Sequence, residues 1–168
     1  MNIVDIDMEA LIETISNEDD NLGKSFLDTY TGEVIYIPTE VSSALEKGTL
    51  KDGIFDNWLK EFVNLAILIS EDQVSRYLST PLLDDDFYIR TMQKYVKDTI
   101  RDSDLKGELN KALNSKEPIK KFKHVLMDKQ DKINDSQTEE WYEYEDICIN
   151  EFVTAWINSN GIELKYLN

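Results

Sequence analysis

The sequence contains few residues able to act as nucleophiles or as soft metal ligands. It has one cysteine, Cys148, and one histidine, His124. Nucleophilic catalysis needs a base within hydrogen-bonding reach, and a structural zinc site needs four Cys or His ligands. Cys148 lies at helical spacing from Trp141, Tyr144 and Phe152, which predicts a packed thiol of low reactivity. The sequence therefore excludes structural zinc and gives no support to cysteine catalysis.

Other catalytic and metal-binding patterns are equally weak. His124 adjoins several lysines and has no neighbouring carboxylate that would orient it as a catalytic base. Residues 102–107 imitate the start of a calcium-binding loop, but Lys106 and Leu113 occupy positions that need oxygen ligands. The six glycines are too scattered for a phosphate-binding loop. Among 34 acidic residues some carboxylates will be close by chance, so such pairs indicate little. We expect no enzyme, no cofactor and no metal.

Charge is distributed unevenly along the 168 residues. The chain has 34 Asp and Glu against 18 Lys and Arg, a net charge of -16. Residues 90–132 contain 12 basic and 7 acidic residues, a net of +5, so the rest of the chain carries -21. Residues 133–151 contain seven acidic residues and no Lys or Arg. Charged faces of this kind either stay solvated or bind a partner of opposite charge.

Two charged stretches supply the candidate binding residues. Six lysines lie within residues 116–132, and Phe122 is interleaved with them as an aromatic residue would be in a nucleic-acid contact. However, Ile119, Phe122 and Leu126 share a helix face, which favours Phe122 as a core residue and the lysines as a solvated face. The candidate residues are Lys120, Lys121, Phe122, Lys123, His124, Glu139, Glu140, Trp141, Tyr142 and Glu143.

The elements that must position these residues follow from apolar spacing. A short helix is predicted over residues 4–15. A β-hairpin is predicted over 25–37, in which Gly32 takes a positive φ and Pro38 closes the second strand. A polar connector with Gly48 and Gly53 precedes a wide apolar stripe over 55–67, which predicts a central helix. Three aspartates at 84–86 predict the start of the next helix, Asp104 is expected to cap a further one, and Pro118 fits a first helical turn.

The composition indicates a single folded domain. A chain of this length buries about 70% of its unfolded surface, and 41% of the residues are hydrophobic. We predict an α+β fold, a mostly helical single domain over 1–168 with an N-terminal β-hairpin packed on a helical bundle. Its parts are a helix and hairpin over 1–38, a helical body over 54–160 and a short strand over 162–167, after a stop at Gly161. The acidic N-terminus and the short apolar runs predict no signal peptide and no membrane span, hence a cytoplasmic protein.

Three stretches resemble a known family. They are FLDTYTGEVIYIP at residues 26–38, RYL at 76–78 ahead of Pro81, and IKKFKHVL at 119–126 followed by Trp141 and Tyr142. Their order and spacing over residues 26–163 resemble a bacterial family catalogued as uncharacterised protein family zero-one-five-eight. The resemblance implies an α+β protein of the bacterial cytoplasm and brings no activity. Where the family pattern has Phe, Arg, Arg and Asp, this chain has Ile119, Lys120, Lys121 and His124. The positive charge is kept, but the planar guanidinium groups are absent at these positions.

The sequence leaves several functions open. The leading hypothesis is a non-enzymatic interaction or regulatory protein with a dipolar surface, binding a protein partner or a second copy of itself through complementary faces. A less favoured hypothesis is nucleic-acid binding through residues 116–132. A third is an acidic mimic of nucleic acid that binds a basic partner. No membrane partner is expected.

Overall fold

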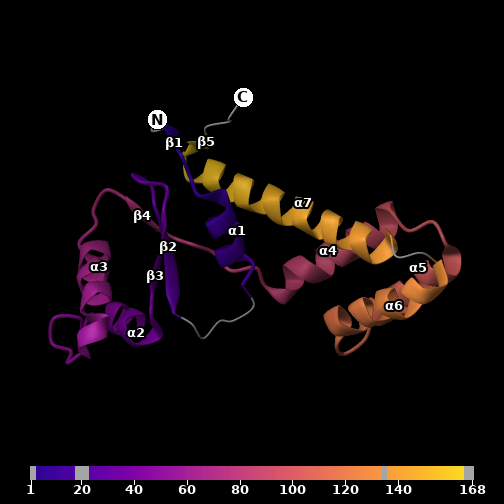
Figure 1. Ribbon diagram of the computed structural model, residues 1–168, viewed down its shortest axis with the longest axis horizontal. Coiled ribbons are helices and arrows are strands. Elements are labelled where there is room, and N and C mark those ends of the chain that lie inside the picture. Colours follow the sequence, from indigo (N-terminus) through magenta and orange to yellow (C-terminus); the bar gives the residue numbers. More distant parts are fainter. Residues whose placement is uncertain (1–2, 18–22, 134–135, 165–168) are drawn as a thin grey trace. The chain divides into compact units, whose positions relative to one another are not determined.

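The structure, a computed structural model, describes residues 3–17, 23–133 and 136–164 (Figure 1). Its residues group into two compact units. The first, here called the sheet unit, comprises the described residues up to Leu82 and those from Val153 onward. The second, the helical unit, is Leu83–Phe152. Helices predominate, with a small antiparallel sheet near the N-terminus, so the predicted mostly helical α+β class is confirmed.

The sheet unit is built on a three-stranded antiparallel sheet with the order β3-β2-β4. The predicted hairpin is confirmed as β2 (Lys24–Asp28) and β3 (Val34–Ile37), which pair with Leu27 opposite Val34. The third strand, β4 (Tyr77–Ser79), pairs with the other edge of β2 and was not predicted. Three residues are too short a run to show the alternation by which strands are recognised.

Gly32 sets the geometry of the hairpin turn, as predicted. Its φ is 79°, in the left-handed region that residues with a Cβ rarely adopt. A Cβ added here would also lie 2.0 Å from the Asp5 carbonyl oxygen. The Gly32 N–H donates to the Asp28 carbonyl oxygen at 2.8 Å, and its own carbonyl accepts from the Asp7 N–H at 3.1 Å. The turn is therefore fixed both to its own strand and to the chain that enters the first helix.

One face of the sheet is covered by two helices. Phe26 and Ile37 pack with residues of α2 (Thr39–Lys47), the 3-10 helix η1 (Asn57–Leu59) and α3 (Lys60–Ser70) in one apolar cluster. α2 lies partly within the predicted connector and was missed, because its sequence TEVSSALEK has only three apolar positions. α3 was expected to be a central helix. Instead Ala66 is its one buried residue, since the three-stranded sheet covers only part of its circumference.

The two ends of the described chain meet in a second sheet. β1 (Ile3–Val4) precedes α1 (Met8–Ile15) and pairs in parallel with β5 (Glu163–Leu164). Asp7 caps α1 by accepting the Ala10 N–H at 3.0 Å, and Leu11 and Ile15 are buried. The prediction of a strand over 162–167 is confirmed for the two residues of β5, and residues 165–167 lie outside the described residues.

Four helices form the helical unit: α4 (Asp85–Asp98), α5 (Ser103–Leu113), α6 (Pro118–Ile133) and α7 (Ser136–Ser159), whose last turns, from Val153, belong to the sheet unit. Asp84 caps α4 through the Phe87 N–H at 2.9 Å, as the run of aspartates predicted. The predicted cap at Asp104 is wrong: Asp102 accepts the Leu105 N–H at 2.7 Å, and Asp104 lies in the first turn. Pro118 opens α6 as predicted.

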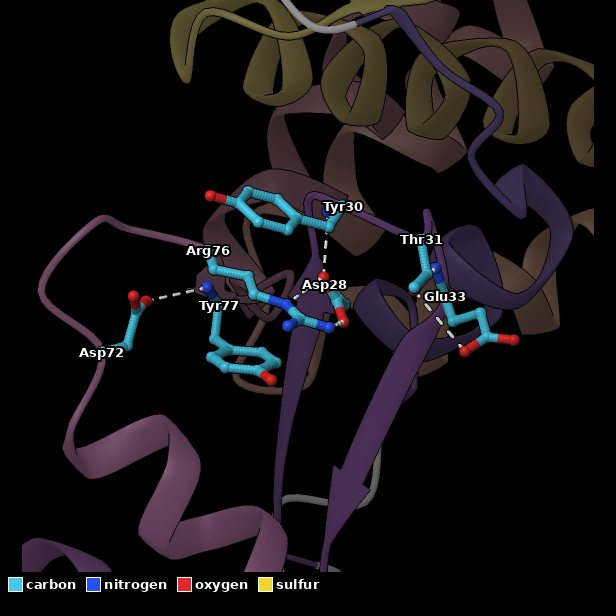
Figure 2. Close-up of polar contacts among 7 residues, drawn as sticks. All are labelled: Asp28, Tyr30, Thr31, Glu33, Asp72, Arg76 and Tyr77. Atoms are coloured by element: carbon cyan, nitrogen blue, oxygen red, sulfur yellow. Dashed lines mark hydrogen bonds and ion pairs between the residues drawn. The ribbon is translucent and has the colours of Figure 1, made fainter.

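An ion pair between buried Asp28 and half-buried Arg76 joins the hairpin to the start of β4. Asp28, at the end of β2, is 4% exposed. Its carboxylate accepts from Arg76 Nε at 3.0 Å and from Arg76 Nη2 at 2.6 Å, and also from the Tyr30 N–H at 2.9 Å. Figure 2 shows the guanidinium between the rings of Tyr30 and Tyr77, whose centroids lie 5.0 and 4.9 Å from its central carbon. The chain segment before β4 is thus anchored to the hairpin turn.

The loop that presents Arg76 is itself held in shape. Asp72 accepts the Val74 N–H at 3.0 Å. It also accepts the Tyr77 N–H at 3.0 Å (Figure 2). The Tyr77 bond is the main cause that lowers the pKa of Asp72. Ser75 has a φ of 58°, which is strained for a residue with a side chain. The hydrogen bonds of Asp72 and the Asp28–Arg76 ion pair together stabilise the backbone conformation of Ser75.

We predict that Asp28→Asn lowers the free energy of unfolding near pH 7 by about 2 kcal/mol, because it removes charge-assisted hydrogen bonds to a buried carboxylate. Burial raises the pKa of Asp28, but the Arg76 and Tyr30 bonds outweigh it and leave that pKa below its ordinary 3.8. The stabilisation is therefore present above about pH 4 and is lost as the pH falls through the lower folded-state value.

Urea unfolding of both proteins between pH 7 and pH 2 measures this effect. The stabilities of the natural chain and the Asp28→Asn variant should converge as the pH falls below 4. Asp52→Asn is the matched control, because Asp52 is exposed, and it should leave stability unchanged. A difference between natural chain and Asp28→Asn variant that stays constant at every pH would contradict the proposed role of the ionised carboxylate.

Candidate functional site

The predicted binding residues of α6 and α7 stand on an aromatic core. Phe122 of α6 and Trp141 of α7 are 0% and 1% exposed, with ring centroids 5.0 Å apart. Tyr95 of α4 lies 5.1 Å from Trp141 and 6.5 Å from Phe122, and Leu126 is buried in the same cluster. Phe122 and Trp141 are thus core residues and cannot contact a partner at the surface. For Phe122 this agrees with the helix face that it shares with Ile119 and Leu126. Their role is to fix α6 against α7.

A pair of polar groups completes this core. Gln137 Nε2 donates to the Tyr95 hydroxyl oxygen at 2.6 Å, and that hydroxyl lies 3.4 Å from the Gln137 carbonyl oxygen. Burial raises the pKa of Tyr95 to about 12. The hydroxyl therefore remains a neutral hydrogen-bonding group at physiological pH. It links α4 to the first turn of α7, directly beside the acidic residues of that helix.

The cationic candidates of α6 lie on the outer side of this core. Lys120, Lys121 and His124 are exposed, and Lys123 is half-buried. Lys120 Nζ lies 3.5 Å from Glu117 Oε1 in an exposed ion pair. Exposed ion pairs contribute little to the stability of the folded state. Lys116 is also exposed, whereas the side chains of Lys129 and Lys132 lie outside the described ones. We call Lys120, Lys121, Lys123 and His124 the basic face.

The anionic candidates are exposed on the first turns of α7. Glu139, Glu140 and Glu143 are exposed, and Tyr142 is 42% exposed beside them. Glu140 accepts a hydrogen bond from Gln137 Nε2 at 3.0 Å, which orients its carboxylate. We call Glu139, Glu140 and Glu143 the acidic face. Tyr142 adds a partly apolar ring to it.

The charges of both faces are largely uncompensated within the chain. Among the side chains that the structure describes, no lysine of the basic face lies within 4.0 Å of a carboxylate of the acidic face. The basic face therefore keeps its positive charge in a protein of net charge -16. Ion pairing with a partner would therefore compete only with the exposed Lys120–Glu117 pair among the ion pairs described for these faces.

Cys148 lies in a shallow groove between α4 and α7, on the helical unit. The groove has a volume of about 350 Å³, and its lining includes Arg90, Lys94, Glu151 and the edge-to-face rings of Phe87 and Phe152. The thiol is half-buried, and burial raises its pKa. It therefore stays protonated near neutral pH and is a poor nucleophile, which agrees with the sequence interpretation.

A larger cleft lies in the sheet unit, and sequence reasoning missed it. Its volume is about 600 Å³, and residues of α1, β2, β3 and β4 line it. Tyr36, which is 43% exposed, and Ser25 contribute hydroxyls, and Thr80 Oγ1 donates to the Ser25 carbonyl oxygen at 3.1 Å. Glu13 and Lys24 are its charged residues, and Lys24 forms an ion pair with Glu46. This lining can hydrogen-bond a polar group, but it does not place a base beside a nucleophile.

Within residues 3–17, 23–133 and 136–164, no three His, Cys, Asp or Glu residues come together as a metal site requires. None of the helices described is both long enough and apolar enough to cross a membrane. The absence of a cofactor and of an enzymatic activity remain predictions.

The fold and these surfaces define a class: a small α+β protein whose sheet unit and helical unit share the long helix α7. The chain belongs to the Uncharacterised protein family (UPF0158), whose model matches residues 1–167. This confirms the family resemblance. The chain is 27% identical to UPF0158 protein PA5073 of Pseudomonas aeruginosa over 138 residues, which cover 82% of this chain and 73% of that protein. No solved structure matches the chain significantly.

We predict that Phe122→Ala destabilises the protein by about 4 kcal/mol, because it leaves a cavity against Trp141 and Tyr95. Lys121→Ala, one position away, should change stability by no more than about 0.5 kcal/mol because Lys121 is exposed. Urea unfolding followed by near-ultraviolet circular dichroism measures both. Equal, small effects of the two substitutions would show that Phe122 does not anchor α6.

Proposed function

We propose that this protein is a non-enzymatic, cytoplasmic interaction or regulatory protein. Its helical unit binds a protein partner through the basic face of α6 and the acidic face of α7. The single observation that supports this function most strongly is that, among the described side chains, both charged faces are exposed and form no ion pair with each other, beside an aromatic core that joins α6 and α7. Rigid complementary charges raise the rate of association and select the partner.

The structure weighs against the nucleic-acid alternative on one point. Base stacking on an exposed aromatic ring supplies much of the affinity for single strands. Phe122 was the aromatic residue proposed for that role, and it is 0% exposed. The lysines of residues 116–132 would then contact phosphates alone, against the repulsion of a strongly acidic protein. A protein partner with an acidic surface or a second copy of this chain is the better match.

A charge-reversal pull-down from bacterial lysate tests the proposal. The variant Lys120→Glu, Lys121→Glu, Lys123→Glu should lose a salt-eluted protein partner that the natural chain retains. The matched control is Lys47→Glu, Lys51→Glu, Lys60→Glu, which changes the net charge equally but on the sheet unit. The control should retain the partner.

Two results of the pull-down would overturn the proposal. Loss of the partner by both variants would mean that net charge, and not the basic face, governs binding. The second result is that the natural chain retains nucleic acid and no protein, and that only the variant Lys120→Glu, Lys121→Glu, Lys123→Glu, here called the α6 variant, loses it. This would establish the nucleic-acid alternative instead.

Self-association is the form of the proposal that can be tested without an unknown partner. We predict that the α6 variant and the variant Glu139→Lys, Glu140→Lys, Glu143→Lys each sediment as monomers, whereas an equimolar mixture forms a complex. In the mixture the reversed faces are complementary again, so sedimentation velocity at low salt should show the larger species dissociate as salt rises. A natural chain that is monomeric at every concentration would exclude this form and leave a foreign protein as the partner.

A further inference from the structure

An apolar stripe runs along η1 and α3 and is exposed at Trp58 and Leu68. Trp58, Phe62, Leu65 and Ile69 follow one another at spacings of four, three and four residues, which places them on one side of the helix. Trp58 is 61% exposed and meets Phe62 edge to face at 6.5 Å, while the other three side chains are half-buried. Leu68, 54% exposed, adjoins the stripe one turn beyond Leu65. We call these five residues the α3 stripe.

The α3 stripe borders the helix face that packs on the sheet. Phe62, Leu65 and Ile69 are half-buried because they also pack against the cluster of Phe26 and Ile37, whereas Trp58 and Leu68 are exposed. Ala66 is fully buried and lies within the cluster of Phe26 and Ile37. A helix that is apolar on more of its circumference than its own sheet covers is usually covered by something else. Contiguous exposed apolar side chains that include a tryptophan commonly mark a protein interface, because Trp contributes strongly to binding when it is desolvated.

The surroundings of the stripe are acidic. Residues 51–72 contain five acidic and two basic residues, a net of -3. Asp52, Asp56 and Glu61 are exposed, and one of the two lysines, Lys51, is already bound to Glu71 at 3.1 Å. An acidic rim around an apolar strip favours a partner that combines apolar side chains with positive charge. It disfavours an anionic membrane surface for the same reason.

The geometry points to a docking site for a cationic amphipathic helix of another protein. From Trp58 to Ile69 the stripe spans about 16 Å, which is the length of three turns of a partner helix. Apolar side chains spaced at three and four residues on that helix would cover Trp58, Leu65 and Leu68. Its Lys or Arg residues would reach Asp56 and Glu61, as in other complexes in which a helix lies on an apolar surface. This site is separate from the basic and acidic faces and does not depend on them.

A designed peptide tests the site directly. The probe is a fluorescein-labelled, amidated 18-residue helix of Leu and Lys in an amphipathic pattern, titrated at 150 mM salt and followed by anisotropy. The full chain should bind it, and Leu68→Ser with Glu61→Lys should weaken binding about tenfold. Both substituted residues are exposed, so the variant should fold, and its unfolding midpoint checks this. A peptide with Glu in place of every Lys should not bind.

The matched control distinguishes this site from the acidic face. Ile147→Ser with Glu143→Lys removes one exposed apolar residue, 58% exposed, and reverses one exposed carboxylate on α7. Unchanged peptide binding by this control supports the α3 stripe. Equal weakening by both variants, or binding of the Glu peptide, would overturn the proposal. So would a natural dimer that Leu68→Ser dissociates, because the occupant would then be a second copy. Failure of the charge-reversal pull-down would leave this result unaffected.

Discussion

The carboxylate of Asp28 is the constraint on which the sheet unit depends. A buried carboxylate is strongly destabilising unless charge and hydrogen bonds compensate it. Here Arg76, next to the sequence-distant strand β4, supplies the charge and two of the hydrogen bonds. The side-on contact with Arg76 uses both carboxylate oxygens, and the Tyr30 N–H adds a third bond. Satisfying Asp28 therefore requires the segment before β4 to approach the hairpin turn. A three-residue strand has too few ladder bonds to select this position by itself.

The rings around Arg76 explain why this ion pair can form near the surface. Arg76 retains 35% exposure of its side chain, so water would compete for its donors. Tyr30 and Tyr77 lie on the two sides of the guanidinium and shield it while leaving its edge free for Asp28 (Figure 2). The Thr29 N–H also donates to the Arg76 carbonyl oxygen at 2.8 Å, so the backbone and the side chain of Arg76 hold the same turn. Lysine could not reproduce this planar, two-point contact.

Sequence reasoning predicted the elements whose signals are local. Gly32 indicated the hairpin turn, and Asp84 and Pro118 indicated where two helices begin. The spacing of Phe122 and Leu126 indicated which side of α6 faces the core. It did not predict β4 or the pairing of Asp28 with Arg76, because these depend on contacts 48 residues apart that no short-range pattern encodes.

The candidate site was predicted only in part, because the sequence indicates which residues are charged but not how the elements pack. The lysines and glutamates at the surface follow from composition, and the structure leaves them exposed apart from half-buried Lys123. Trp141 was predicted to be a binding residue because its neighbours in the sequence are charged, yet it is buried. Adjacent residues of a helix do not face the same side, so the charged neighbours of Trp141 are exposed while its own ring faces the core. The cleft beside Tyr36 and the α3 stripe depend on how much surface the small sheet covers. That is a property of the packed unit and of no single segment.

The two proposed kinds of surface would contribute differently to binding. Exposed charges such as those of α6 and α7 are screened beyond about 8 Å at physiological salt, so they mainly accelerate encounter and align the partner. Desolvation of a Trp and its apolar neighbours is far less sensitive to salt and mainly slows dissociation. The two proposed surfaces lie on separate units, and the partners proposed for them differ in chemistry. Because neither surface uses residues of the other, their affinities can be tuned independently by substitution.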